Sequence, residues 1–104
     1  MQRVAFKMRL NPGEAAEYCR RHDAIWPELK TLLREKGVRN YSIFLDPESN
    51  AMFAYLERPD DHAMEELPGD PVMKRWWQFM KDIMTANADG SPVSTPLAEV
   101  FYLE

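Results

Sequence analysis

The chain has 104 residues, of which 45% are hydrophobic, 12% aromatic and 29% charged, and it carries a net charge of −4 at pH 7. This length predicts a single domain over residues 1–104, and the composition excludes a disordered chain. The negative charge and the scattered basic residues argue against a protein that binds nucleic acid. No apolar run reaches the roughly 18 to 20 residues that would cross a membrane, and residues 1–7 lack the apolar core of a secretory signal.

The cysteine and histidine content limits the chemistry further. The single cysteine, Cys19, excludes an intramolecular disulfide framework and is typical of a reducing compartment. The only histidines are His22 and His62, and no group of ligands has the spacing of a metal site. We therefore expect a cytoplasmic protein that uses no metal.

The N-terminal third predicts one strand and one long helix. Apolar and basic residues alternate from Arg3 to Leu10, as in a strand buried on one face. Asn11-Pro12-Gly13-Glu14 is typical of a helix start with the asparagine as cap, and the helix is expected to reach about Lys36 and stop at a left-handed Gly37. Because proline lacks an N–H, Pro27 marks either a kink in this helix or a junction between two shorter ones.

A hairpin follows the helix. Predicted strands run from Arg39 to Asp46 and from Asn50 to Arg58, and Asp46-Pro47-Glu48-Ser49 between them has proline at the second position of a type I turn. Both strands carry apolar residues on both faces, whereas a sheet covered on one side only would alternate more regularly with polar residues.

The second half predicts two helices, a loop and a strand. Pro59 to Leu67 predicts a short polar helix, and Pro68-Gly69-Asp70-Pro71 a break. From Pro71 to Met84, apolar residues recur at offsets of three, four and seven, as on one face of a helix. Thr85 to Pro96 is rich in turn-forming residues and predicts a loop, and Leu97 to Leu103 predicts a last strand.

The order strand–helix–strand–strand–helix–strand is that of the ferredoxin-like split βαβ arrangement, an α+β fold. We expect a four-stranded antiparallel sheet with the helices on one face. The uncovered face would be apolar, and exposed patches of that size normally contact a partner. With no partner domain in the chain, a symmetric homodimer packed sheet against sheet is the simplest way to cover it.

Three aromatic groups of the first helix are candidates for a site. Tyr18, His22 and Trp26 recur at intervals of four, which predicts that they share one face. His22 is the one group on this stripe that titrates near neutral pH, but a core histidine with both nitrogens hydrogen-bonded would fit the pattern too. The small set of titratable groups favours proton transfer or isomerisation over hydrolysis of a stable bond.

The neighbouring tryptophans of the second helix are the other candidates. Trp76 and Trp77 diverge by about 100°, so one indole can enter the core while the other faces sideways. Aromatic walls suit the C–H faces of sugars, with polar groups binding the hydroxyls. A tryptophan-rich core or dimer contact is the alternative, and Met73, Met80 and Met84 are expected to pack in the core.

Several separated motifs carry a resemblance: Tyr18…Arg21-His22…Ile25-Trp26-Pro27-Glu28-Leu29, Asn40-Tyr41, Arg75-Trp76-Trp77, and Ser91-Pro92-Val93…Glu99-Val100-Phe101-Tyr102-Leu103. Over essentially all 104 positions the chain resembles the L-rhamnose mutarotases. The resemblance implies a dimeric α/β barrel of ferredoxin-like subunits that interconverts the α and β anomers of L-rhamnose and needs no cofactor.

The resemblance also implies His22 as the catalytic proton donor, with Tyr18, Tyr41, Trp76 and Trp77 contacting the sugar. Anomerisation protonates the ring oxygen and deprotonates the anomeric hydroxyl, so general acid–base help can suffice. We expect His22 to donate to the ring oxygen, with a bound water or a second polar group taking the hydroxyl proton. Tyr18 is the first candidate for that group.

Two other functions fit the same architecture. One is another enzyme, such as a small monooxygenase or a lactone isomerase, acting on flatter and more hydrophobic substrates. The other is a ligand-binding or dimerisation module without catalysis. The topology alone does not separate these, because this fold hosts many functions.

Overall fold

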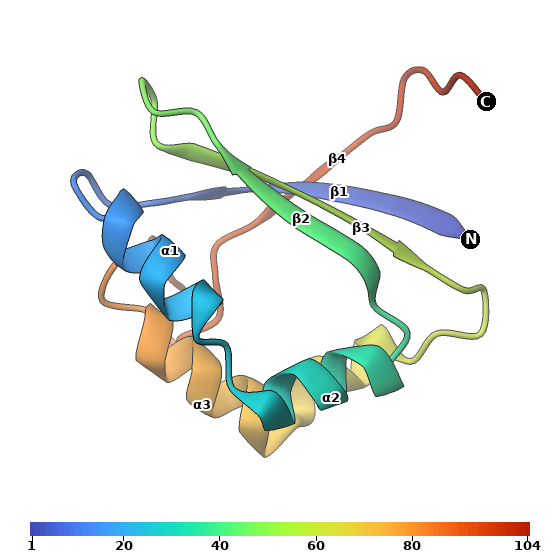
Figure 1. Cartoon of the computed structure of the whole chain (residues 1–104), viewed down its shortest axis with the longest axis horizontal. Coiled ribbons are helices and arrows are strands. Elements are labelled where there is room, and N and C mark those ends of the chain that lie inside the picture. Colours follow the sequence, from blue (N-terminus) through green and yellow to red (C-terminus); the bar gives the residue numbers. More distant parts are fainter.

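The computed structural model describes all 104 residues and contains one four-stranded sheet with helices on one of its faces (Figure 1). The strands, antiparallel throughout in the order β2-β3-β1-β4, are β1 (Gln2–Arg9), β2 (Arg39–Leu45), β3 (Ala51–Arg58) and β4 (Thr95–Leu97). The helices are α1 (Ala15–Asp23), α2 (Pro27–Glu35), the 3-10 helix η1 (Met64–Gly69) and α3 (Pro71–Met80). The expected α+β, ferredoxin-like arrangement is confirmed.

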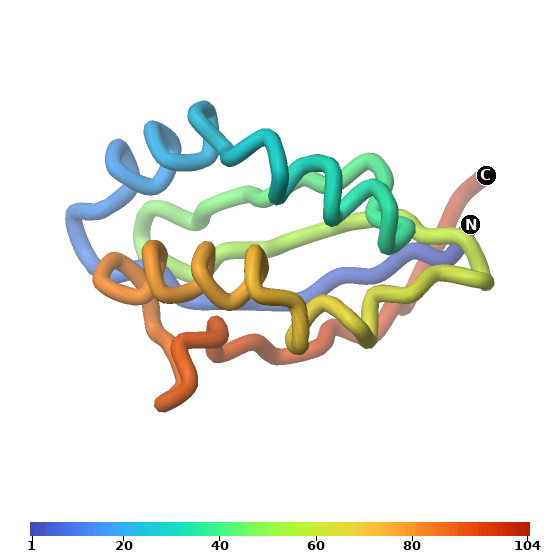
Figure 2. Tube along the Cα trace, turned by 90° about the horizontal axis from the view of Figure 1, so that it is seen from below, coloured from blue at the N-terminus to red at the C-terminus, as the bar shows by residue number.

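The helices form two rows over the sheet. α1 and α2 follow one another in one row, and α3 lies alongside (Figure 2). The core fills the space between them and the inner face of the sheet, and its least exposed large side chains are Leu10, Leu29, Met52 and Leu56. Met73, Met80 and Met84 are buried there as expected. α1 contributes no buried residue.

The long first helix is in fact two helices. Pro27 begins α2, and Trp26 before it is extended, with φ −60° and ψ 132°. Proline favours the first turn of a helix, where its missing N–H has no intrahelical partner in any case. The junction is therefore confirmed, and the stripe of Tyr18, His22 and Trp26 on a single helix is wrong. The stop is confirmed at Gly37, whose φ is +103°.

Two other helix limits differ from the prediction for one reason. Asn11 does not cap α1, which begins at Ala15. Its backbone N–H bonds the carbonyl of Ile83, and its side chain donates to the carbonyl of Asp82. These bonds attach the residues just after β1 to Asp82 and Ile83, so α3 ends at Met80 and does not reach Met84.

The short polar helix starts later than predicted and is a 3-10 helix. Its start at Met64 is set by His62, whose Nδ1 accepts from the backbone N–H of Met64, and by Ala63, whose N–H bonds the carbonyl of Lys36. Pro68 and Gly69 lie inside it and not in a break.

The last strand also differs from the prediction. β4 spans three residues, and the chain leaves the sheet after Leu97. The apolar side chains that follow find no cover, since Val100 is 93% exposed, Phe101 76% and Leu103 79%. The predicted strand Leu97 to Leu103 is therefore wrong: β4 begins earlier, at Thr95, and of the predicted stretch only Leu97 pairs with β1.

The outer face of the sheet, turned away from the helices, carries large apolar side chains on β2 and β3, as expected, and β1 adds Lys7 beside Phe53. Phe44 of β2 and Phe53 of β3 lie opposite one another and are 66% and 40% exposed. No helix in the structure has both the length and the hydropathy that crossing a membrane requires.

Candidate active site

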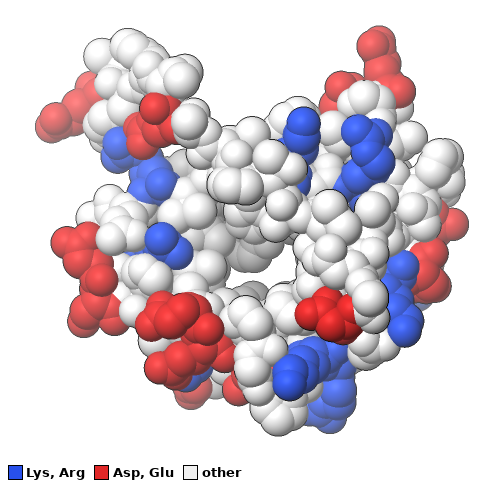
Figure 3. All heavy atoms as spheres, turned by 180° about the vertical axis from the view of Figure 1, so that it is seen from behind, with Lys and Arg blue, Asp and Glu red and all other residues white.

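A cavity of about 1120 Å³ lies between the helices and the inner face of the sheet. Mostly uncharged atoms surround the hollow at the centre of the molecule (Figure 3). All five residues expected to form the site line it: Tyr18, His22, Tyr41, Trp76 and Trp77. The structure thus brings together α1, β2 and α3, which are far apart in the sequence.

His22 has a defined tautomer. Its Nδ1 lies 3.0 Å from the backbone carbonyl oxygen of Tyr18. Because a carbonyl only accepts, Nδ1 carries the hydrogen, which leaves a lone pair on Nε2. Burial lowers the pKa of His22 from 6.5, and this effect exceeds the opposing one of the bond to Tyr18. Near neutral pH the site therefore holds a neutral imidazole that is ready to accept a proton.

The two tyrosines enter the cavity as neutral phenols. The ring of Tyr18 stacks on His22 with centroids 4.2 Å apart, and burial raises the pKa of its hydroxyl. Tyr41 is 40% exposed as a whole residue, yet desolvation of its hydroxyl raises the pKa to about 12. Such groups form hydrogen bonds near neutral pH but are poor bases.

A bulge in β2 helps to place Tyr41. The pairing with β3 shifts by one residue between Arg39 and Ser42, and Asn40 has a φ of +48°. After the shift, the Tyr41 ring lies on the helix side of the sheet, 6.4 Å from the ring of Phe6. Bulges commonly redirect a side chain in this way beside functional sites.

Trp76 and Trp77 differ in burial as expected, and both line the cavity. Trp76 is 6% exposed and meets His22 edge to face, with centroids 5.4 Å apart, while Trp77 is only half-buried. Trp26 does not line the cavity. It packs edge to face on Trp76 at 5.1 Å and against Phe79 at 5.7 Å. Trp26 thus supports Trp76, the aromatic side chain that contacts His22.

Sequence reasoning missed the polar part of the lining. Asn87, Asp89, Ser91 and Ser94 line the cavity from the segment after α3. Its turn-forming composition predicts only a loop, and no local signal shows that the loop folds toward the helices. Asp23 and Asn40 also line the cavity, beside His22 and Tyr41 respectively.

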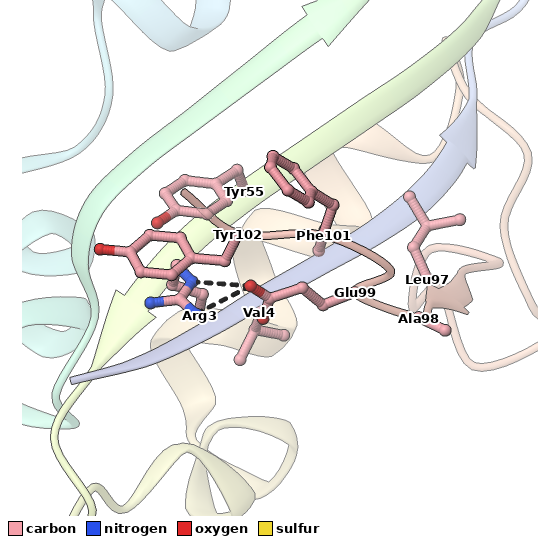
Figure 4. A pocket seen from close by; sticks show the side chains of 9 residues that line it. Arg3, Val4, Tyr55, Leu97, Ala98, Glu99, Phe101 and Tyr102 are labelled. Carbon is pink, nitrogen blue, oxygen red and sulfur yellow. Dashed lines mark hydrogen bonds and ion pairs between the residues drawn. The ribbon is translucent and has the colours of Figure 1, made fainter. Parts of the chain in front are cut away.

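A second cavity, of about 370 Å³, lies between the outer face of the sheet and the C-terminal segment (Figure 4). Arg3 pairs there with Glu99 at 2.8 Å, and its guanidinium lies 3.6 Å from the centre of the Tyr102 ring. Arg3 and Glu99 satisfy one another, and no histidine is present. His22, the candidate acid–base group, lines the larger cavity.

Comparisons with known proteins identify the family of this chain. The family model described as L-rhamnose mutarotase matches residues 3–103. The L-rhamnose mutarotase of Rhizobium meliloti (strain 1021) is 57% identical over 104 residues and is covered, like this chain, to 100%. That of Leptothrix cholodnii is 56% identical over 103 residues, which cover 99% of this chain and 97% of the relative.

Solved structures give the same result. The crystal structure of an L-rhamnose mutarotase from Formosa agariphila matches with a TM-score of 0.93 at 51% identity, over 100% of both chains. The tetracenomycin F2 cyclase of Streptomyces glaucescens matches with a TM-score of 0.58 at 23% identity, over 100% of this chain and 97% of the cyclase, and shares the fold alone. From its sequence over nearly its full length and from its structure, the chain belongs to the L-rhamnose mutarotase family.

Proposed function

We propose that this chain interconverts the α and β anomers of L-rhamnose in the larger cavity. The observation that carries the proposal is a neutral His22, with its Nε2 lone pair available, in an aromatic-lined cavity large enough for a monosaccharide. Membership of the mutarotase family supports the choice of sugar.

The lowered pKa of His22 favours its acting first as a base. Nε2 takes the proton of the anomeric hydroxyl, and the C1–O1 bond becomes a carbonyl as the bond from C1 to the ring oxygen breaks. The imidazolium then gives the same proton to the ring oxygen. Rotation of the open aldehyde exposes its other face, and the steps run in reverse to close the ring. Donation of a proton by His22 to the ring oxygen, the role expected in the sequence analysis, is the second of these two proton transfers.

The other residues bind and orient the sugar. Tyr18 and Tyr41 stay protonated and so offer hydroxyl hydrogen bonds to the substrate. The indoles of Trp76 and Trp77 provide flat apolar surfaces for its C–H faces. The proposed steps transfer protons and break and re-form one C–O bond with no change of oxidation state, so they require no redox cofactor.

The test is saturation exchange between the anomers of L-rhamnose, measured by NMR. General acid–base catalysis typically contributes about 10²- to 10⁴-fold, and His22→Ala is expected to lose an acceleration of this order. His62→Ala is the matched control, since His62 lies outside the cavity. Unchanged exchange in folded His22→Ala would remove His22 from the mechanism. Saturable rhamnose binding to the wild-type chain without accelerated exchange would instead support a binding module.

We further propose that two copies pack through their outer sheet faces. Phe44 and Phe53 are exposed there, and the C-terminal segment is anchored on the same face by the Arg3–Glu99 pair. Light scattering should give twice the 12.2 kDa of one chain, and Phe44→Glu should shift the mass toward a single chain. A wild-type mass of one chain would refute this.

The exposed, unpaired Cys19 favours a reducing, cytoplasmic location, which cell fractionation tests.

A further inference from the structure

The helix that carries the acid–base group has few contacts of its own. α1 holds both Tyr18 and His22 but has no buried residue, unlike α2 and α3. It is also cut off from α2 by the extended Trp26 at the junction. Tyr18 packs against the core, but with no fully buried side chain in α1, polar contacts can contribute to its position over the cavity.

Arg21 makes the polar contacts that link α1 to α3. Its side chain is only 10% exposed. Nη1 donates to Oδ1 of Asp82 at 2.8 Å and to the backbone carbonyl of Phe79 at 2.7 Å, and Nη2 donates to Oδ2 of Asp82 at 3.2 Å. The guanidinium also lies 4.5 Å from the centre of the Phe79 ring. Two hydrogen bonds to one carboxylate fix an arginine in orientation as well as in distance.

The acceptors of Arg21 lie where α3 ends. A cation is favoured at the C-terminus of a helix, since the last carbonyls carry partial negative charge. Three residues earlier on the same helix is Trp76, whose indole meets the His22 ring. One side chain therefore joins the element that carries His22 to the element that carries the aromatic wall of the cavity.

Arg20 provides an internal comparison. It bonds only Glu17, one turn earlier in the same helix, and its side chain is 68% exposed. Glu17 also accepts from Nε of Arg21 at 2.7 Å, which supports the guanidinium from the α1 side. The two adjacent arginines thus share Glu17, but only Arg21 reaches α3.

We propose that Arg21 is a positioning residue, which holds His22 at its working distance from the aromatic wall by tying α1 to the end of α3. This inference rests on the proposed function of His22. Arg21 does not line the cavity and has no contact with the reacting atoms in this scheme. Its effect is on geometry, and small displacements of a catalytic group lower the rate steeply.

The test compares Arg21→Gln with Arg20→Gln. Arg21→Gln is expected to lower kcat for anomer exchange by about 10- to 100-fold, with a smaller change in KM, because Tyr18 is the only proposed sugar-binding residue on α1. Arg20→Gln should stay within about twofold of the wild type, as expected for an exposed ion pair. Arg21→Lys keeps the charge without the forked geometry and should recover part of the loss. Asp82→Asn weakens the same tie from α3 and should reproduce the effect of Arg21→Gln.

A second readout does not depend on activity. In the wild type, NMR should show close contact between the ring protons of His22 and the indole of Trp76. Arg21→Gln should weaken this contact and move the pKa of His22 back toward its ordinary value, since α1 would shield the ring less. Arg20→Gln should change neither.

The outcomes separate this inference from the proposed function. If His22→Ala leaves the exchange rate unchanged, the proposed function fails, but the NMR contact still reports whether Arg21 positions the ring. If Arg21→Gln is folded and keeps both the contact and kcat, the positioning inference is overturned. If Arg21→Gln does not fold, Asp82→Asn decides by the same two measurements.

Discussion

Replacing Tyr18 by phenylalanine distinguishes two roles for its hydroxyl. The substitution removes one oxygen and keeps the ring that stacks on His22 at 4.2 Å. It also leaves the backbone carbonyl of residue 18, which accepts from Nδ1 of His22 at 3.0 Å. The tautomer of His22 and the aromatic packing should therefore persist, so the change in rate reports on the hydroxyl alone.

The expected magnitude follows from the charge state of the phenol. Burial raises the pKa of Tyr18, so near neutral pH the hydroxyl can only form a hydrogen bond with the neutral sugar. Such a bond contributes about 0.5 to 1.5 kcal/mol, or about 2- to 12-fold in kcat/KM. A general base in the same position would contribute about 10²- to 10⁴-fold.

Anomer exchange measured by NMR over a range of rhamnose concentrations gives kcat/KM for the wild type and for Tyr18→Phe. A loss within the hydrogen-bond range is the expected result. A loss of 100-fold or more, with the fold intact by circular dichroism, would refute the reasoning and make Tyr18 the group that takes the hydroxyl proton.

Four further predictions concern pH and local structure. Because the pKa of His22 is lowered from 6.5, kcat/KM measured by polarimetry should fall with an acid midpoint below 6.5, after subtraction of the uncatalysed rate. Between a pH of about 6.5 and that midpoint, the unfolded chain binds a proton on His22 before the folded chain does. The free energy of unfolding, measured by urea titration, should therefore decrease as the pH falls through this range and be restored above about pH 6.5. Asp70→Ala removes the side-chain cap that accepts from Val72 N–H at 2.9 Å at the start of α3, and should cost about 1 kcal/mol in urea unfolding. Gly37→Ala should cost more than about 1 kcal/mol in the same assay, because φ is +103° and a Cβ would lie 2.9 Å from that of His62; a neutral result would contradict the strain.

The topology was predictable because its signals are local. Alternation in β1, the turn at Asp46–Ser49 and the spacing of apolar residues in α3 each depend on a short stretch of chain. The failures have distant causes. The junction before Pro27 places Trp26 against Trp76, which lies 50 positions away, and the missing N–H of proline alone does not decide between a kink and a break. The end of α3 depends on Asn11 in the same way.

The site residues likewise fall into two groups: those that local sequence predicts and those that depend on the fold. A spacing of four correctly placed Tyr18 beside His22, since both lie on α1. The approach of Tyr41 and Trp77 to the same cavity follows from the fold and was expected only through the family resemblance. The lowered pKa of His22 arises chiefly from burial, so the proposal that it acts first as a base could not be made from the residues around it in the sequence.

The absence of buried side chains in α1 has a consequence for how this protein loses its activity. Segments without fully buried side chains open at a lower free energy than the core, so the backbone amides of α1 should exchange with deuterium faster than those of β1 or β3. Local opening of this one helix would displace His22, the proposed acid–base group, while the sheet and α3 stay folded. Inactivation by heat would then precede global melting, and a melting temperature would overestimate the range over which the protein works.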